Sequence, residues 1–191
     1  MKHAFSFLVL AGGQGSRMGG ADKGLVVWQG KPLIRHIHDT IRPFTDDLII
    51  SCNRNRREYL RYSDQIIGDA ESGFPGPLAG VIAGMAIARH DRCVLLPCDA
   101  PGVDSTLINE LMLTGRRTSA AVMLRQGNQW QPMFSVIPKG YFPALQTAWK
   151  EGQRSLMRVL LTLDVQPLDI PEDDSRLDNI NSLEQLGELT S

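Results

Sequence analysis

A glycine-rich stretch near the start of the chain holds the residues best suited to chemistry. Residues 12–23 contain five glycines and only three ionisable side chains, Arg17, Asp22 and Lys23. Glycines let a backbone approach a ligand closely and direct successive N–H groups at one point. A phosphate chain is the usual occupant of such a concavity, and the two cations would neutralise its charge. The stretch therefore predicts a phosphate-binding loop.

The spacing excludes two common phosphate-binding patterns. The Walker pattern requires Gly before its Lys and Ser or Thr after it, whereas Asp22 precedes Lys23 and Gly24 follows it. The dinucleotide fingerprint requires its third glycine where this chain has Met18. A flexible turn with scattered charge is the alternative interpretation. The position of the loop directly after the apolar run from Phe5 to Leu10 favours ligand binding instead.

Asp99 is the second candidate. It follows the apolar run from Arg92 to Leu96 and lies between Pro97 and Pro101, which restrict its backbone. A carboxylate at such a point can hold Mg²⁺ against phosphate oxygens. A turn or N-cap aspartate without a catalytic role is the alternative. We expect Asp99 to be the metal ligand.

Three side chains would have roles if the bound phosphate chain belongs to a nucleotide and the reaction is a nucleotidyl transfer. Such a transfer builds negative charge on the α-phosphate and on the departing pyrophosphate, which Lys23 and Arg17 could stabilise. A surface position for Lys23 and an ion pair between Arg17 and Asp22 are the alternatives. Asp69 could read guanine, because a carboxylate can accept parallel hydrogen bonds from the ring N–H and the amine. An ordinary turn aspartate is the alternative there.

Apolar runs and turn residues predict the elements that position these side chains. Strands are expected at 5–10, 47–51, 65–67, 92–96 and 120–125, and helices at 31–42, 53–62, 78–88 and 104–114. Later in the chain we expect a strand at 130–137, helices at 141–151 and 155–161, a strand at 165–168 and a helix at 182–189. Pro132 suggests that the strand at 130–137 is antiparallel and at a sheet edge.

This alternation predicts an α/β fold: a three-layer, Rossmann-like, mostly parallel sheet with helices on both faces. Ligands bind such sheets at the carboxyl ends of the strands. The glycine loop, residues 51–53, Asp69 and Asp99 all follow strands, so we expect them on one rim. We expect one domain over residues 1–191, with a nucleotide-binding half at about 1–105 and an acceptor-binding half at about 106–191.

Composition excludes several classes of protein. A net charge of −1 gives no electrostatic footprint for nucleic acid, and no apolar run is as long as a membrane span. The first residues lack a signal peptide, and the three cysteines are expected to be reduced and mostly buried, which indicates a cytoplasmic protein. Arginines at 54, 56, 57 and 61 are expected on a solvated helix face.

Candidate acceptor-binding residues lie in the second half. Arg154 precedes a helical run and could hold an anionic acceptor. Asn179 and Asn181 flank Ile180, so both would point to one side of an extended segment. Capping of a following helix is a strong alternative for the two asparagines.

Four stretches together resemble the molybdenum cofactor guanylyltransferases. The first is the glycine loop, which reads LAGG, RMGG and DKGL in segments from Leu10 to Leu25. The other three stretches that are similar to the family are PGPLAG at 75–80, PCDAP at 97–101 and NINSLEQL at 179–186. The resemblance implies a nucleotidyltransferase-type fold and the transfer of GMP from GTP to the terminal phosphate of Mo-molybdopterin, with release of pyrophosphate. It also implies that molybdenum-insertion proteins and molybdoenzyme chaperones are possible partners.

The same resemblance implies a set of nucleotide-binding positions. It also implies that Asp99 is the Mg²⁺ ligand. The family uses an Asn at the end of the second strand, where this chain has Ser51, with Asn53 two residues on. Either could make that contact. The expected nucleotide-binding positions are Leu10, Ala11, Gly12, Gly13, Lys23, Ser51 or Asn53, Asp69 and Asp99.

Three other functions stay open at this point. Cytidylyl transfer to the same pterin is the nearest, and nucleotidyl transfer to another small phosphorylated acceptor is the second. A GTP-binding module without turnover is the third, from a different class. Release of pyrophosphate would separate an enzyme from such a module.

Overall fold

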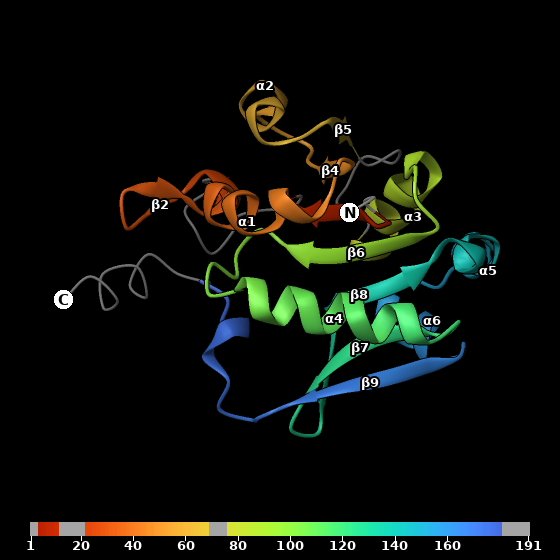
Figure 1. Cartoon of the computed structure of the whole chain (residues 1–191). Coiled ribbons are helices and arrows are strands. Elements are labelled where there is room, and N and C mark those ends of the chain that lie inside the picture. Colours follow the sequence, from red (N-terminus) through yellow and green to blue (C-terminus); the bar gives the residue numbers. More distant parts are fainter. Residues whose placement is uncertain (1–3, 12–21, 69–75, 181–191) are drawn as a thin grey trace.

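The computed structural model describes residues 4–11, 22–68 and 76–180 of the chain (Figure 1). The strands are β1 (Ser6–Leu10), β2 (Val27–Trp28), β3 (Lys31–Pro32), β4 (Leu48–Ser51), β5 (Gln65–Ile67), β6 (Arg92–Pro97), β7 (Ala121–Gln126), β8 (Gln129–Pro138) and β9 (Val165–Ile170). The helices are α1 (Leu33–Ile41), α2 (Arg56–Tyr59), α3 (Pro77–Ile87), α4 (Ser105–Arg117), α5 (Phe142–Lys150) and α6 (Leu156–Leu161). Short 3-10 turns are η2 (Lys23–Leu25), η3 (Arg42–Phe44), η4 (Leu60–Tyr62), η5 (Lys139–Tyr141) and η6 (Ser175–Leu177).

One seven-stranded sheet runs through the molecule in the order β5-β4-β1-β6-β8-β7-β9. β1 pairs in parallel with both β4 and β6, and β5 continues the parallel side. β8 is antiparallel to its neighbours β6 and β7, and β9 returns parallel to β7. The sheet is therefore mostly parallel, and β8 is its reversed strand.

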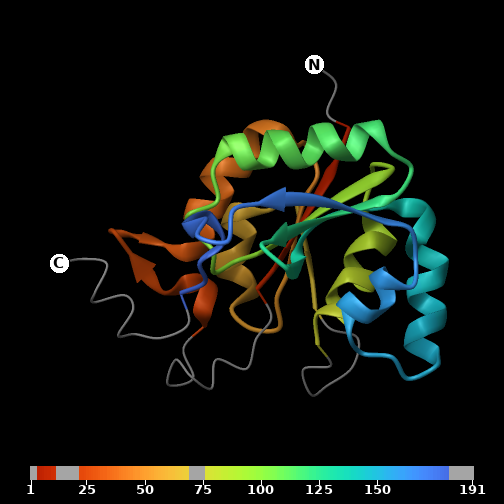
Figure 2. The ribbon, with the colours of Figure 1, turned by 90° about the horizontal axis from the view of Figure 1, so that it is seen from below.

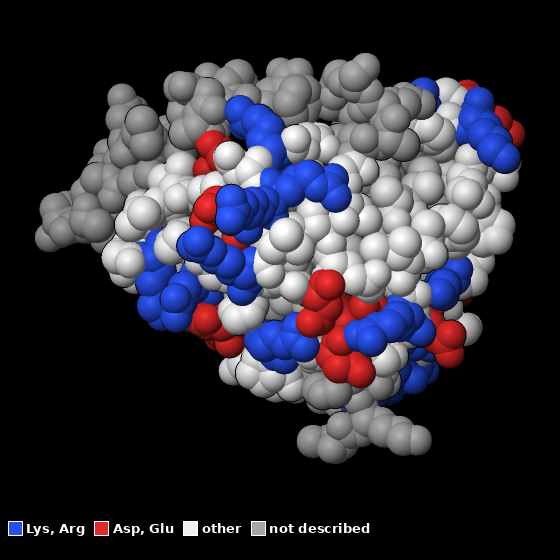
Figure 3. Space-filling view, turned by 90° about the horizontal axis from the view of Figure 1, so that it is seen from above, with Lys and Arg blue, Asp and Glu red and all other residues white. Residues whose placement is uncertain are grey.

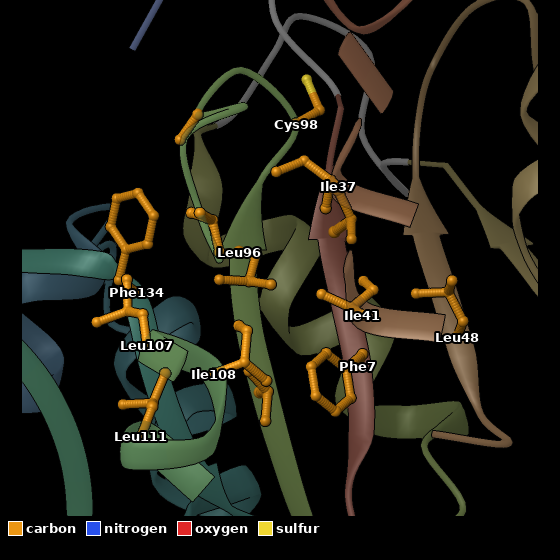
Figure 4. Packing of buried hydrophobic residues seen from close by; sticks show 14 of the residues in the cluster. Phe7, Ile37, Ile41, Leu48, Leu96, Cys98, Leu107, Ile108, Leu111 and Phe134 are labelled. Atoms are coloured by element: carbon orange, nitrogen blue, oxygen red, sulfur yellow. The ribbon is translucent and has the colours of Figure 1, made fainter. Parts of the chain in front are cut away.

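Helices cover both faces of the sheet and make three layers (Figure 2). On one face, α1 and α4 pack on β1, β6 and β8, with Phe7, Ile37 and Ile108 fully buried (Figure 4). On the other face, α3, α5 and α6 pack on the same sheet around Leu8 and Leu145. Successive residues of β1 thus point to opposite faces and are buried on both, which explains its unbroken apolar sequence. The expected α/β architecture is confirmed.

The start of the expected helix at residues 31–42 is wrong, because Lys31 and Pro32 belong to the hairpin β2–β3. Gln29 and Gly30 form its two-residue turn with φ values of 46° and 75°. Such a turn twists in the same sense as the strands that it joins, so it closes a tight hairpin. Pro32 is extended, with φ −57° and ψ 144°, and α1 begins directly after it.

The expected edge position of the strand at 130–137 is also wrong. That strand, β8, is antiparallel as expected but lies between β6 and β7. Pro132 is tolerated there because the register with β7 shifts between Met123 and Leu124, whose partners are Ser135 and Gln131. The irregularity removes the need for a ladder hydrogen bond at the proline. The helix expected at 182–189 lies outside the described residues.

The three cysteines are buried and unpaired, as expected. Burial raises the pKa of Cys52 to about 11 and that of Cys93 to about 12. Across the three described ranges, no helix is long and apolar enough to cross a membrane.

Asp47 joins the strands at the amino edge of the sheet. Its side chain is fully buried. The carboxylate accepts hydrogen bonds from Ser6 Oγ at 2.5 Å, Gln65 Nε2 at 2.8 Å and the Arg89 amide at 2.8 Å. Arg89 Nε also lies 3.1 Å from the carboxylate. One side chain thus joins the starts of β1, β4 and β5 to the residues that follow α3.

Replacing this carboxylate with a neutral amide should destabilise the protein in a pH-dependent way. Burial alone would raise the pKa of Asp47, but its hydrogen-bond donors and the charge of Arg89 lower the pKa below the ordinary value. The stabilisation is therefore complete above the unfolded-state pKa, about 3.9, and is lost as pH falls through the lower folded-state pKa. We expect Asp47→Asn to lower the free energy of unfolding by about 1–3 kcal/mol at pH 7.

Urea denaturation of both proteins between pH 7 and pH 3 measures this difference. The control is Asp39→Asn, which alters an exposed carboxylate that pairs with Lys31 at 3.3 Å. It should cost little at any pH. A deficit of Asp47→Asn that stays constant down to pH 3 would contradict the assigned role of the carboxylate charge.

Candidate active site

The centre of the site is an ion pair between Lys23 Nζ and Asp99 Oδ2. Lys23 begins η2, and Asp99 follows β6, so the pair joins residues 76 positions apart in sequence. The two side chains are 22% and 15% exposed, which leaves them accessible from one side. The structure thus brings together the cation and the carboxylate that the sequence singled out.

Backbone pairing explains the position of Asp99. β1 lies between β4 and β6, and the hydrogen bonds continue past the strand ends, from Ala11 N to Ser51 O at 2.8 Å and from Cys98 N to Leu10 O at 3.2 Å. All three strands therefore end at one edge, from which the chain leaves toward η2 and Asp99. Leu10, Ala11 and Ser51 lie at this edge, as expected.

Ser51 and Asn53 differ in accessibility. Ser51 is 3% exposed and is covered by α3, where a Cβ on Gly80 would lie 3.0 Å from the Ser51 hydroxyl oxygen. Asn53 is exposed, and its Oδ1 would lie 3.5 Å from a Cβ on Gly68, the residue after β5. Of the two, Asn53 is the side chain that a ligand at this edge can reach.

The C-terminal segment comes back to the same edge. The Ile180 amide donates to the Asp99 carbonyl at 2.9 Å, and the Ile180 side chain is buried. Asn179, beside it, is exposed. A candidate acceptor residue therefore adjoins the segment that is bonded to the Asp99 main chain.

Arg154 lies in the turn between α5 and α6, and its guanidinium stacks on Trp149, with the carbon Cζ 3.7 Å from the ring centroid. Nη1 donates to the carbonyls of Trp149 at 2.9 Å and of Gln153 at 3.1 Å. The Arg154 carbonyl would lie 3.7 Å from a Cβ on Gly76, at the start of α3. These contacts orient the guanidinium, which still has further N–H donors for an anion.

Several expected site residues lie outside the described ranges. They are Gly12, Gly13, Arg17, Asp69 and Asn181. Their roles stay predictions.

Sequence analysis missed a hydrogen-bonded group beside Lys23. Asp22 accepts from the Tyr59 hydroxyl through Oδ1 and from Asn55 Nδ2 at 3.0 Å through Oδ2. The sequence suggests only Arg17 as a partner for Asp22. A usable signal was Tyr59 itself, because a buried tyrosine hydroxyl requires a partner.

Three of the four arginines expected on a solvated helix face are exposed on α2 and η4, whereas Arg54 precedes α2 and is half-buried. Arg56, Arg57 and Arg61 are exposed, and Arg61 pairs with Glu58 at 3.2 Å. Figure 3 shows this side of the molecule, with blue side chains gathered over it and red ones beside them.

The oxygen atoms of Asp99 fit a hard divalent cation. Within the described ranges, no group of three or more His, Cys, Asp or Glu side chains forms a ready-made metal cage. Mg²⁺ does not need such a cage, because it is commonly held by one or two carboxylates together with substrate phosphates and water. A single carboxylate beside a cation at the carboxyl edge of parallel strands suits that mode.

Comparison with known proteins identifies the family. The model of the MobA-like NTP transferase domain matches residues 7–166. Relatives from Pseudomonas putida strains GB-1 and F1, both named molybdenum cofactor guanylyltransferase, are 56% and 57% identical over 95% of each chain. The chain belongs to this family.

Membership of the molybdenum cofactor guanylyltransferases makes the protein an enzyme, a nucleotidyltransferase. A solved structure, molybdopterin-guanine dinucleotide biosynthesis protein A from Archaeoglobus fulgidus, has the same fold with a TM-score of 0.77. It is 25% identical, and the match covers 96% of this chain and 95% of that one. Enzymes of this family generally use a divalent metal ion.

Close packing of α3 against the strand ends can be tested with Gly80→Ala. A Cβ at this position would lie 2.9 Å from Leu10 Cδ2 and 3.0 Å from Ser51 Oγ, so these two side chains or α3 itself must shift. We expect a loss of about 1–3 kcal/mol in the free energy of unfolding, measured with urea. We also expect weaker GTP binding by calorimetry.

The matched control is Gly140→Ala in η5, because a Cβ there would meet nothing within 4 Å among the described residues. Its stability should equal that of the wild type or rise slightly. Equal stability of Gly80→Ala and the wild type would show that the Leu10 and Ser51 side chains or α3 accommodate the added methyl group, which contradicts close packing at this point.

Proposed function

We propose that the protein transfers GMP from GTP to the terminal phosphate of Mo-molybdopterin, forming molybdopterin guanine dinucleotide cofactor and pyrophosphate. The names of the relatives support this substrate pair, since they share more than half of the residues over 95% of the chain. The single structural observation that carries the proposal is the Lys23–Asp99 pair at the carboxyl edge of the parallel strands. Nucleotides bind α/β sheets at that edge.

The reaction is a substitution at the α-phosphorus of GTP. An oxygen of the pterin phosphate forms a bond to this phosphorus, and the bond to the oxygen that bridges the α- and β-phosphates breaks. The acceptor is already an anion at neutral pH, so the protein does not need a general base. Its task is to align two anions that repel each other and to offset the charge that grows on pyrophosphate.

Lys23 is the described residue best placed for this task. It lies at the start of η2, beside the strand end that leads into the glycine loop, and it is held by Asp99. When GTP binds, the ammonium can exchange Asp99 for phosphate oxygens at little cost, because both partners are anions. We propose that Arg17 and the N–H groups near Gly12 and Gly13 add to this neutralisation.

Asp99 would hold Mg²⁺ through a carboxylate oxygen. The ion would supply positive charge to the triphosphate, beyond what Lys23 provides. Release of Asp99 from Lys23 on GTP binding leaves this oxygen available for the ion.

Nucleotide recognition would fall to the strand ends next to β1. We propose that Leu10 and Ala11 contact the nucleotide through the backbone and that Asp69 reads guanine. Because Ser51 is buried under α3 and Asn53 is exposed, we propose Asn53 as the contact that follows the second parallel strand.

The acceptor would bind on the other side of Asp99. We propose that Asn179, Asn181 and Arg154 contact the pterin, in a half of the chain from about residue 106 onward. Molybdenum-insertion proteins and molybdoenzyme chaperones are proposed as donors and receivers of the pterin. The buried, unpaired cysteines support a reducing compartment such as the cytoplasm.

The choice of nucleotide tests the proposed function directly. With Mg²⁺ and Mo-molybdopterin, GTP should release pyrophosphate at a rate at least about 100-fold above CTP and ATP, since guanine hydrogen bonds left unmade are costly. A pyrophosphate-release assay with each nucleotide measures this. Faster release from CTP would make the protein a cytidylyltransferase, and binding of GTP without release would make it a non-catalytic module.

Removal of the Lys23 ammonium should abolish most turnover. We expect Lys23→Ala to lower kcat by about 100-fold to 1,000-fold, the range typical of losing one preorganised charge stabiliser. Circular dichroism and the unfolding midpoint should stay close to wild type, because the side chain is partly exposed. The matched control is Lys31→Ala, which removes an exposed lysine of β3 that pairs with Asp39. Near wild-type turnover of Lys23→Ala would remove Lys23 from the mechanism.

A further inference from the structure

Asp22, the residue before Lys23, is held by two side chains at opposite ends of α2. Its Oδ1 accepts from the Tyr59 hydroxyl, and its Oδ2 accepts from Asn55 Nδ2 at 3.0 Å. Asn55 caps α2, and Tyr59 is the last residue of that helix. The carboxylate therefore anchors the start of η2 to a separate element of the fold.

Tyr59 is the rigid member of this group. Its side chain is fully buried in the core beneath α2. Burial raises the pKa of Tyr59 above its ordinary value, so the hydroxyl keeps its proton and remains a donor to Asp22. Because the ring cannot move without disturbing the core, the point at which Asp22 is held is fixed.

Gly24 brings η2 close to that fixed point. A Cβ on Gly24 would collide with the Tyr59 hydroxyl, and it would lie 3.2 Å from ring carbon Cε1. The residues on both sides of Lys23 thus meet the same tyrosine, Asp22 by a hydrogen bond and Gly24 by backbone contact. The backbone of Lys23 is confined between them.

The same contacts also orient the Asp22 carboxylate. A carboxylate on the residue next to Lys23 could otherwise turn toward the ammonium and compete with phosphate for it. Each oxygen of the Asp22 carboxylate accepts a hydrogen bond from a neutral donor, Tyr59 or Asn55, so the carboxylate stays turned toward these two side chains.

We propose that Tyr59, acting through Asp22, is a positioning residue for guanylyl transfer, which places the Lys23 ammonium where negative charge grows. This inference rests on the proposed function, and it assigns a role to a residue that the ligands need not touch. An error of about 1 Å in the position of such a group can cost about 100-fold in rate.

The test is Tyr59→Phe, which removes the hydroxyl and keeps the buried ring. We expect kcat to fall about 10-fold to 100-fold, while KM for GTP changes less than about threefold, because an interaction made mainly in the transition state lowers kcat. The unfolding midpoint separates this loss from a loss of fold. Tyr141→Phe is the matched control, because it removes a hydroxyl that donates to the Asp164 carbonyl at 2.7 Å from η5. It should leave kcat unchanged.

A double-mutant cycle shows whether Tyr59 acts through Lys23. Single-turnover rates, with enzyme in excess over the pterin, are compared for the wild type, Tyr59→Phe, Lys23→Ala and the double variant. If Tyr59 only positions Lys23, then Tyr59→Phe should cost nothing more once the ammonium is absent. A merely structural role would lower the rate in both backgrounds.

The outcomes separate the inference from the proposed function. Wild-type kcat in Tyr59→Phe, or losses that multiply in the cycle, would overturn the positioning role while leaving Lys23 in the mechanism. A wild-type rate in Lys23→Ala would instead defeat the proposed mechanism, and the inference with it.

If Tyr59→Phe does not fold, a second variant tests the same inference. Asn55 is exposed and has φ 50°, so Asn55→Gly keeps its left-handed backbone and removes the other hydrogen bond to Asp22. We expect the same pattern with a smaller loss, about threefold to tenfold. An unchanged kcat in a folded Asn55→Gly protein would count against the inference.

Discussion

The pairing of β1 between two parallel partners is the constraint on which the rest of the structure depends. Parallel neighbours start at one edge of a sheet and end at the other, so polar residues after each strand must gather. Hydrogen bonds from Ala11 to Ser51 and from Cys98 to Leu10 extend this pairing to the last residue before each loop. The ladder thus places Asp99 at this edge, and the contacts of Asp22 and Gly24 with Tyr59 hold Lys23 where it meets that carboxylate.

One edge of the sheet carries a buried carboxylate that stabilises the fold, and the opposite edge carries the residues proposed for the reaction. At the amino edge, Asp47 is fully buried, and its carboxylate accepts hydrogen bonds from several segments of the chain. Its charge therefore stabilises the contacts between these segments. At the carboxyl edge, Lys23 and Asp99 are partly exposed and hold each other. Substrates can therefore replace these partners without disturbing the hydrogen bonds that keep the strands in register.

The sequence predicts well what depends on local patterns. The apolar runs of β1 and β6 locate Asp99 and the common edge, because a strand buried on both faces has an unbroken apolar sequence. It predicts poorly what depends on distant partners. Pro132 looks like an edge residue until the register shift beside it is known. Likewise, the hydrogen bond from Tyr59 to Asp22 joins the end of α2 to the residue before η2, two segments whose proximity only the folded sheet determines.

The hydrogen bond from Ile180 to Asp99 has an evolutionary consequence. It joins two main-chain groups, so it survives the replacement of either side chain, with proline at position 180 as the clear exception. Selection on side-chain identity therefore leaves almost no record of this link. The identities of the two side chains answer to other demands, the site for Asp99 and burial for Ile180, while the main chain alone keeps this segment attached beside residue 99.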